Sequence, residues 1–231
     1  MNGFIEIAEN QSGFQELLKY HKENISPVRV TSTAESQKVH LAFSLCRKLD
    51  KGLLYISADS LSSTFIAEDF SFFTDENVLT YPAREYRFYS VEADSNNNTK
   101  ERINTLNNLV YSKDKKIIIT TIEAVAQKIV AKDSFINNTF LFREGLVYEI
   151  ASVTERLVKL GYRREHEVEG KGQFAVRGGI LDVFPFTDDY AYRIEFFDEE
   201  IESVRKIDPS TQRSVEKVKE ISVSPASEDL Q

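Results

Sequence analysis

The order of hydrophobic patterns along this chain constrains its fold more than any other feature. Between residues 28 and 130, short apolar runs, which predict strands, alternate with segments of helical periodicity. The predicted strands are 28–32, 52–58, 77–82 and 115–121, and the predicted helices are 14–22, 34–50, 60–73, 99–113 and 121–130. This alternation is typical of α/β folds, so we expect an open, mostly parallel RecA- or Rossmann-like sheet with helices on both faces over residues 1–128.

The pattern changes after residue 128. A predicted helix at 149–162 is followed by short alternating runs, separated by Gly, Asp or Pro-Ser turns, with no helix between them. Such runs are typical of an antiparallel sheet. We therefore expect a small inserted α+β domain over residues 129–211. Residues 212–231 are then expected to form a truncated return segment toward the first domain.

The composition is that of an ordinary globular protein, and the net charge bears on which classes of partner the chain can bind. The sequence contains 37 acidic residues against 29 Lys and Arg, which gives a net charge of −8. An acidic chain is not a typical stand-alone nucleic-acid binder, because a polyphosphate attracts a basic surface, although a local basic face can exist within an acidic total. The sequence contains neither a secretory signal nor an apolar run that could span a bilayer. We expect a cytoplasmic protein without a membrane partner.

Residues that bind metals are few and scattered. Cys46 is the only cysteine, so no internal disulfide can form, which fits a reducing compartment. His21, His40 and His166 lie far apart in the sequence, and none has a cysteine at ligand spacing. We therefore expect no metal site.

The junction between the predicted strand 28–32 and helix 34–50 stands where a phosphate-binding loop would lie. Such a loop needs two glycines, a lysine for charge and a Ser or Thr hydroxyl for magnesium. With the pattern anchored on Lys38, Ser32 and Gln37 take the glycine positions and Val39 takes the hydroxyl position. Only the lysine remains, so we interpret these four residues as a vestigial Walker A loop and expect no nucleotide cofactor.

The segment EFFDEE at 195–200 is similar to a Walker B strand that ends in an acidic pair. The apolar alternation resumes directly after it, so a hairpin with a turn near 198–200 is the simpler interpretation. No base or metal ligand accompanies these acids, and we expect no catalytic residue here.

Charge is unevenly distributed in the second predicted domain. Residues 151–177 contain six Lys or Arg and four acids, whereas residues 178–208 contain nine acids and three basic residues. Charge on exposed strands usually serves solvation. Arginine beside Gly-Gly and aromatic residues is also typical of a protein-docking face, so both interpretations remain open.

The segment GQFAVRGGILDVFPFTDDYAYRIEFFDEEIESVRKIDPSTQRS closely resembles a stretch shared by bacterial transcription-repair coupling factors and the excinuclease protein UvrB. The upstream LVKLGYRR, the downstream ISVSPA and the segment TYPAREYRFYS extend the resemblance over nearly the whole chain. UvrB keeps an intact phosphate loop and a long DNA-threading hairpin. This chain has the degenerate loop and too few residues between Tyr81 and Thr99 for the hairpin, which favours the coupling factors.

The resemblance implies a function in protein docking. It implies that the chain is an N-terminal fragment whose second domain docks the excinuclease protein UvrA in transcription-coupled nucleotide excision repair. ATP and magnesium chemistry, DNA translocation and RNA polymerase binding would then belong to absent domains. The fragment itself would be non-enzymatic and would contact the rest of the coupling factor.

Contact residues are carried over from the family onto matching positions. They are Arg163 in LGYR and Arg177 in VRGG, with Phe174, Phe196 and Phe197 as further candidates. UvrB has a further arginine where this chain has Ala175, which weakens an exact transfer. The alternative is a nucleotide-dependent DNA helicase or damage-binding domain of the UvrB type, which would require phosphate binding at residues 32–39.

Overall fold

The computed structural model describes residues 2–31, 33–74, 78–84 and 92–229. The chain divides into two compact units. The first contains residues 1–85 and 113–127, and the second contains residues 86–112 and 128–231. The predicted fold class is confirmed, because a parallel sheet lies in the first unit and antiparallel sheets lie in the second. The predicted boundaries at 128 and 211, and the return of residues 212–231 to the first domain, stay predictions.

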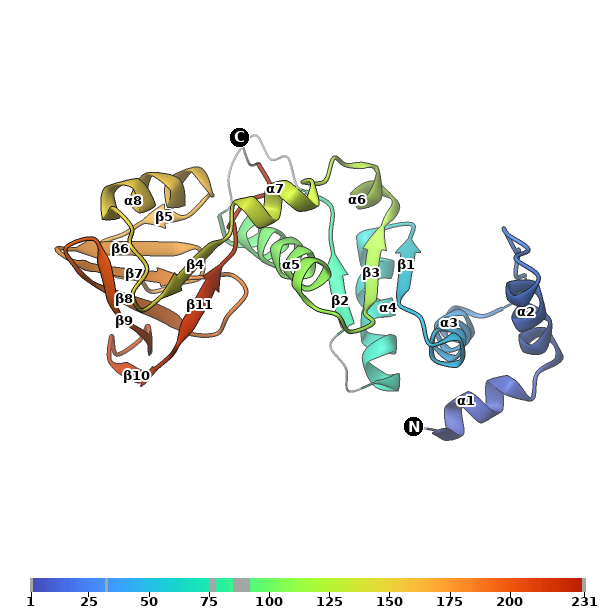
Figure 1. The fold of residues 1–231 in the computed structure, drawn as a ribbon. Helices are drawn as coiled ribbons and strands as arrows, with labels where there is room; N and C mark the ends of the chain where they lie inside the picture. The colour runs from blue at the N-terminus through green and yellow to red at the C-terminus, as the bar shows by residue number, and fades with distance from the viewer. Residues whose placement is uncertain (1, 32, 75–77, 85–91, 230–231) are drawn as a thin grey trace. The chain divides into compact units, whose positions relative to one another are not determined.

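The first unit is built around a parallel three-stranded sheet with the order β1-β3-β2 (Figure 1). Its elements are α1 (Asn2–Glu9), α2 (Ser12–Lys22), α3 (Glu35–Leu49), β1 (Leu53–Ser57), α4 (Ser60–Phe73), β2 (Val78–Tyr81), β3 (Ile117–Thr121) and α6 (Ile122–Ala126). The central strand β3 is buried at every position, as its run of Ile and Thr residues predicts. Val39 and Phe43 of α3 pack with Ile66 and Phe70 of α4 against this strand.

Local capping explains where α4 begins. The side chain of Asp59 accepts a hydrogen bond of 2.8 Å from the backbone N–H of Ser62, so it satisfies one of the free N–H groups of the first turn. Hydrogen bonding from Ser62 also holds the pKa of Asp59 below its ordinary value. The predicted start of this helix near Ser60 is therefore confirmed.

The predicted strand at 28–32 is wrong for the described residues 28–31. Residues 25–31 have no regular secondary structure, and the side chains of Val28 and Val30 are exposed. A β-branched run forms a strand only where neighbouring backbone groups pair with it. The described sheet ends at β1 and β2, and none of its strands pairs with residues 28–31. Ser32 lies outside the described residues.

The second unit contains a six-stranded sheet with the order β10-β9-β8-β7-β6-β5, in which only the β5–β6 pair is parallel. The strands are β5 (Arg163–Arg164), β6 (Gln173–Arg177), β7 (Ile180–Phe184), β8 (Ala191–Phe197), β9 (Glu200–Ile207) and β10 (Ser214–Lys217). A separate antiparallel pair joins β4 (Phe140–Arg143) to β11 (Glu220–Val223). The helices are α5 (Glu92–Tyr111), α7 (Lys132–Asn137) and α8 (Ile150–Lys159).

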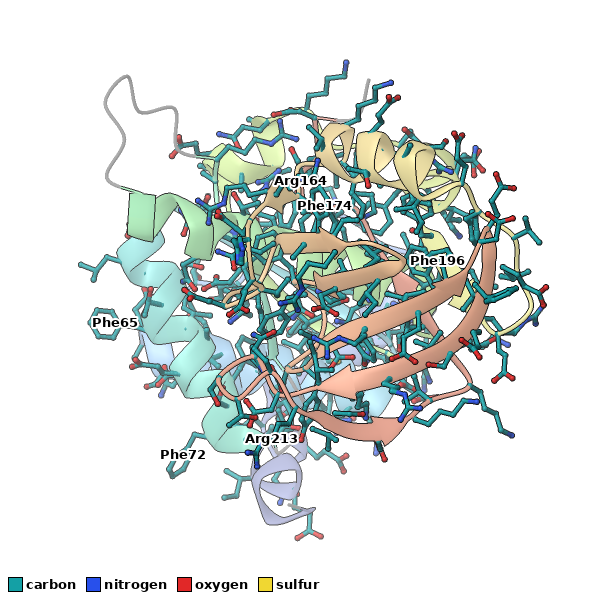
Figure 2. All side chains as sticks on the ribbon, turned by 90° about the vertical axis from the view of Figure 1, so that its left-hand side faces the viewer. Phe65, Phe72, Arg164, Phe174, Phe196 and Arg213 are labelled. Carbon is teal, nitrogen blue, oxygen red and sulfur yellow. The ribbon has the colours of Figure 1, made fainter. Side chains whose placement is uncertain are left out.

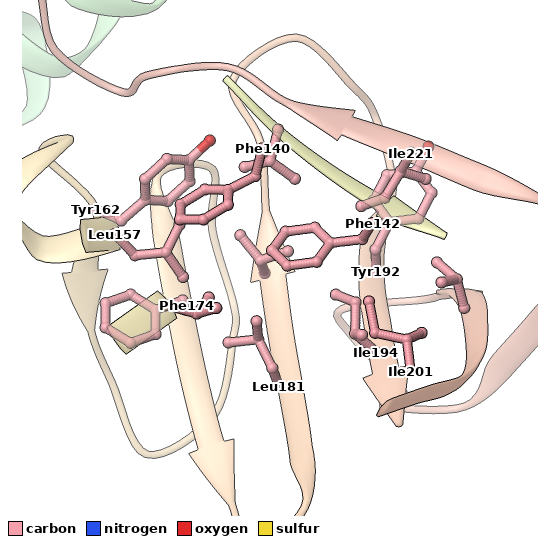
Figure 3. Close-up of a cluster of buried hydrophobic side chains, with 14 of the residues drawn as sticks. Phe140, Phe142, Leu157, Tyr162, Phe174, Leu181, Tyr192, Ile194, Ile201 and Ile221 are labelled. Carbon is pink, nitrogen blue, oxygen red and sulfur yellow. The ribbon is translucent and has the colours of Figure 1, made fainter. Parts of the chain in front are cut away.

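The core of the second unit lies between the six-stranded sheet, the β4–β11 pair and α8. Figure 3 shows Leu157 of α8 beside the ring of Phe140, and the ring of Phe142 over Leu181 and Ile194 of the large sheet. Phe142, Leu157, Leu181 and Ile194 are fully buried. This core lies on one side of the six-stranded sheet. On the opposite side, part of the sheet is covered by a smaller buried cluster of Val168, Ala175, Phe184, Ala191 and Ile207.

Candidate protein-docking site

The outer face is the side of the six-stranded sheet opposite the core. Successive side chains of a strand point to opposite sides. Tyr192, Ile194 and Phe196 of β8 therefore enter the core, and the residues between and after them lie on the outer face. The strand register extends this face over Arg163, Arg177, Asp182, Arg193, Glu195, Phe197, Ser203 and Arg205.

Asp182 is the centre of an ion-pair network on the outer face. Its side chain is 1% exposed, and it lies directly opposite Arg193 in the β7–β8 register. Arg193 donates two hydrogen bonds to this carboxylate, from Nε at 2.7 Å and from Nη2 at 2.8 Å. The same hydrogen bonds raise the pKa of the Arg193 guanidinium above its ordinary value. A forked, charge-assisted pair of this kind holds both side chains in one orientation.

Arg177, a predicted contact residue, belongs to the same network. Its Nη2 donates to Oδ2 of Asp182 at 2.9 Å, and its Nη1 donates to Oε1 of Glu167 at 3.1 Å. Its side chain is 39% exposed. The structure therefore places Arg177 in an ion-pair network within the chain, with part of its side chain at the surface.

A second pair continues the network toward β9. Arg205 lies 3.5 Å from Oε2 of Glu195, measured from its Nε, and Ser203 donates a hydrogen bond to the same carboxylate. Both charged side chains remain partly exposed. The outer face thus presents alternating positive and negative groups, fixed by neighbouring strands.

The three candidate phenylalanines lie in different environments. Phe174 is fully buried and Phe196 is 8% exposed, so both rings belong to the core, where they cannot meet a partner (Figure 2). Phe197 is 77% exposed at the end of β8. It is the one of the three whose position suits an aromatic anchor.

The predicted hairpin with a turn near residues 198–200 is confirmed. Phe197 pairs with Glu200 across the turn, and Asp198 adopts a left-handed backbone conformation with φ of 58°. Aspartate tolerates this conformation better than most residues, which explains the turn at this position. The hairpin holds Phe197 beside the charged network.

Arg163 lies on the outer face at the other end of β6. It pairs with Gln173, the first residue of β6, whereas Arg177 is the last. Four residues of strand separate the two positions, or about 13 Å at roughly 3.3 Å per residue. Both Arg163 and Arg164 are exposed. Figure 2 shows Arg164 on this edge strand. The structure therefore separates the two candidate arginines.

The Gly178–Gly179 turn serves packing within the chain. A Cβ at Gly179 would lie 2.8 Å from the carbonyl oxygen of Phe196, while the N–H of Phe196 donates to the Gly179 carbonyl at 2.8 Å. The close approach at Gly179 is thus made by β8. Gly178 has a φ of 60° and open space around it.

Sequence analysis missed the outer-face residues Asp182, Arg193, Glu195 and Arg205. It also missed Glu167, which pairs with Arg177 from the segment between β5 and β6. Alternation with the core residues of β8 was a signal that could have placed Arg193 and Glu195 on one side. The pairing of Asp182 with Arg193 depends on the register of two strands, which alternation alone does not give.

Three of the four residues that the sequence predicts as a vestigial phosphate loop make contacts within the chain. The side-chain oxygen of Gln37 accepts a hydrogen bond of 3.0 Å from the N–H of Ala34, at the start of α3. Lys38 pairs with Glu35, and their hydrogen bond raises the pKa of the lysine. Val39 is 1% exposed in the core of the first unit.

We expect no measurable binding of Mg-ATP in a calorimetric titration. A phosphate loop needs glycines at the positions of Ser32 and Gln37 and a hydroxyl at the position of Val39, and this chain has neither. The Lys38→Ala variant serves as the control and should give the same flat isotherm. Micromolar binding that Lys38→Ala removes would contradict this prediction.

Two kinds of feature were sought among the described residues: a cluster of metal ligands and a membrane-spanning helix. These residues contain no group of three or more His, Cys, Asp or Glu side chains arranged to hold a metal ion. None of the helices in this part of the chain combines the length and the apolar character needed to cross a membrane.

Comparison with known proteins gives a family match that lies within the second unit. The UvrB interaction domain family matches residues 140–228, which include the core and the outer face of the second unit. The transcription-repair-coupling factor of Bacillus subtilis (strain 168) is 24% identical over 229 residues, or 99% of this chain. That of Staphylococcus aureus (strain bovine RF122 / ET3-1) is 30% identical over 200 residues, or 86% of this chain. The chain spans only 19% and 17% of these two relatives.

The family match and the relatives agree on the same region. The matched residues contain the segment whose motifs resemble coupling factors, and the similarity to those proteins continues over most of the remaining chain. Residues 140–228 therefore form a UvrB interaction domain, in a chain that belongs with the transcription-repair-coupling factors.

Proposed function

We propose that this chain is a non-enzymatic docking module that binds the excinuclease protein UvrA through the outer face. In the longer protein it would recruit UvrA to stalled RNA polymerase in transcription-coupled nucleotide excision repair. Contacts with RNA polymerase and DNA, and ATP-dependent translocation, would belong to other parts of a coupling factor, which would also contact this module.

The observation that carries the proposal is the composition of the open part of the outer face. It combines an exposed aromatic ring, Phe197, with two arginines. Arg177 forms an ion pair with Asp182, and Arg205 forms one with Glu195. Aromatic residues and arginine dominate the binding energy of protein interfaces, particularly when their side chains are already ordered. The match to the UvrB interaction domain supports the choice of partner.

The direct test is a binding titration of this chain with purified UvrA, followed by the Phe197→Ala and Arg177→Ala variants. We expect each variant to weaken binding by about 2 kcal/mol, or roughly 30-fold, as expected for an interface hot spot. The stability of Phe197→Ala should change by less than about 0.5 kcal/mol, because its ring is largely exposed.

Arg163→Ala provides an internal geometric check. Because Arg163 and Arg177 lie at opposite ends of β6, their losses of binding free energy should add. Phe65→Ala is a matched control, since Phe65 is an exposed ring on α4 of the first unit (Figure 2). Absence of binding by the unmodified chain, or equal losses for Phe65 and Phe197, would contradict the proposed function.

A further inference from the structure

The guanidinium of Arg177 has two different neighbours. On one side, Nη2 donates to Asp182, whose side chain is 1% exposed and is also held by Arg193. On the other side, Nη1 donates to Glu167, whose side chain is 46% exposed. The buried carboxylate therefore fixes the orientation of Arg177, whereas the second carboxylate contacts it from the solvent side.

The contact with Glu167 is the one that can be exchanged. Glu167 lies outside regular secondary structure, in the segment between β5 and β6. An exposed pair of this kind contributes little net free energy, because water and salt compete with it. The contact nevertheless shows that the exposed edge of this guanidinium can donate a hydrogen bond to a carboxylate. The pair with Asp182 has already fixed the orientation of the guanidinium for that contact.

The surrounding charges define the ligand that this position suits. The ion-pair network contains three positive and three negative side chains, so its charges balance. They are Arg177, Arg193 and Arg205, and Asp182, Glu195 and Glu167. Removal of the Glu167 carboxylate leaves one uncompensated positive charge, which a single carboxylate would neutralise. A phosphate group, with a charge near −2, would instead meet the nearby Asp182 and Glu195 carboxylates.

We propose that Glu167 occupies, in the free chain, the place of an aspartate or glutamate side chain of the docking partner, and that docking replaces it. This inference rests on the proposed function and adds the chemistry of one contact to it. Glu167 is then an internal competitor that lowers the affinity of the module, and Asp182 is a positioning residue that keeps Arg177 ready for the incoming carboxylate.

The test compares Glu167→Gln with two matched variants in binding titrations with purified UvrA. Glu165→Gln and Glu169→Gln make the same change of charge in the same exposed segment. We expect Glu167→Gln to bind about two- to fivefold more tightly than either control, the fold-change that corresponds to the loss of an exposed competing ion pair. The gain should shrink as salt concentration rises.

The gain must also depend on Arg177. In an Arg177→Ala background, Glu167→Gln should bind no more tightly than Arg177→Ala alone, because the contact for which the two carboxylates compete is gone. This double variant separates competition at one guanidinium from a general effect of charge on association.

The outcomes separate this inference from the proposed function. If the unmodified chain binds and Glu167→Gln behaves like the two control variants, the inference is wrong and the proposed function stands. Weaker binding by Glu167→Gln would mean that Glu167 itself contacts the partner, which also overturns the inference. If the unmodified chain does not bind, the proposed function fails and the inference fails with it.

Discussion

Replacement of Arg102 by Ala is expected to lower the free energy of unfolding by about 3–5 kcal/mol, the range for breaking a buried ion pair. Arg102 of α5 is 2% exposed and donates two hydrogen bonds to the carboxylate of Glu228, which is 6% exposed. The variant leaves a buried carboxylate without the cation that compensates its charge. Urea unfolding followed by circular dichroism measures the loss.

Two further variants test whether the loss of stability comes from the burial of the Arg102–Glu228 pair. Arg143→Ala breaks a pair with Glu220 in which both side chains are about half exposed, so it should cost only about 0–1 kcal/mol. The double variant Arg102→Met with Glu228→Leu should recover most of the stability, because well-packed apolar side chains can replace a buried pair. A loss below about 1 kcal/mol for Arg102→Ala would contradict the burial of this pair.

The Arg102–Glu228 pair joins two segments of the second unit that are distant in the sequence. Arg102 and Glu228 both lie in the second unit, although 126 residues separate them in the sequence. A second contact joins Asn107 of α5 to Ser224, whose Oγ lies 2.6 Å from the Asn107 Oδ1. These contacts hold α5 against the segment that follows β11, so a second-unit fragment that lacks α5 should be less stable than one that includes it.

Replacement of Asp182 by Ala is expected to affect both stability and docking. We expect a loss of stability of about 3 kcal/mol, the low end of the range for a buried pair, because Arg177 and Arg193 remain partly exposed and can be hydrated. Binding to UvrA should weaken on the order of tenfold, since Arg177 loses the carboxylate that orients it. Thermal unfolding and a binding titration below the unfolding transition measure the two effects.

Asp189→Ala is the matched control for Asp182→Ala. Asp189 pairs with Lys171 at 2.8 Å in the same unit, but its side chain is 93% exposed. Its removal should change stability by less than about 1 kcal/mol and leave docking unchanged. Normal binding by a folded Asp182→Ala variant would show that Arg177 does not need this carboxylate for docking.

Much of the fold could be predicted from local sequence. The helical periodicity of residues 34–50 and 60–73 corresponds to α3 and α4, and the β-branched run at 115–121 corresponds to the buried strand β3. Local patterns succeed here because the spacing of apolar residues reports which side of an element is buried. The strand β4 was not predicted, because four residues of alternating burial give a weak signal.

The wrong prediction at residues 28–31 has a different cause from the missed strand β4, because at residues 28–31 the local signal is strong. Val28 and Val30 have high strand propensity, yet their segment pairs with no described strand. A strand requires a partner as well as propensity. Pairing is a property of the tertiary structure, so no local pattern could decide it.

The sequence by itself determined the fold class, the division into two patterns and the resemblance that points to Arg177 and Phe197. Only the tertiary structure decided that Phe196 is buried while its neighbour Phe197 is exposed, and that Arg177 is shared between Asp182 and Glu167. The physical reason is strand register. A shift of one residue moves every side chain of a strand to the other face, and register is set by contacts between segments that are distant in the sequence.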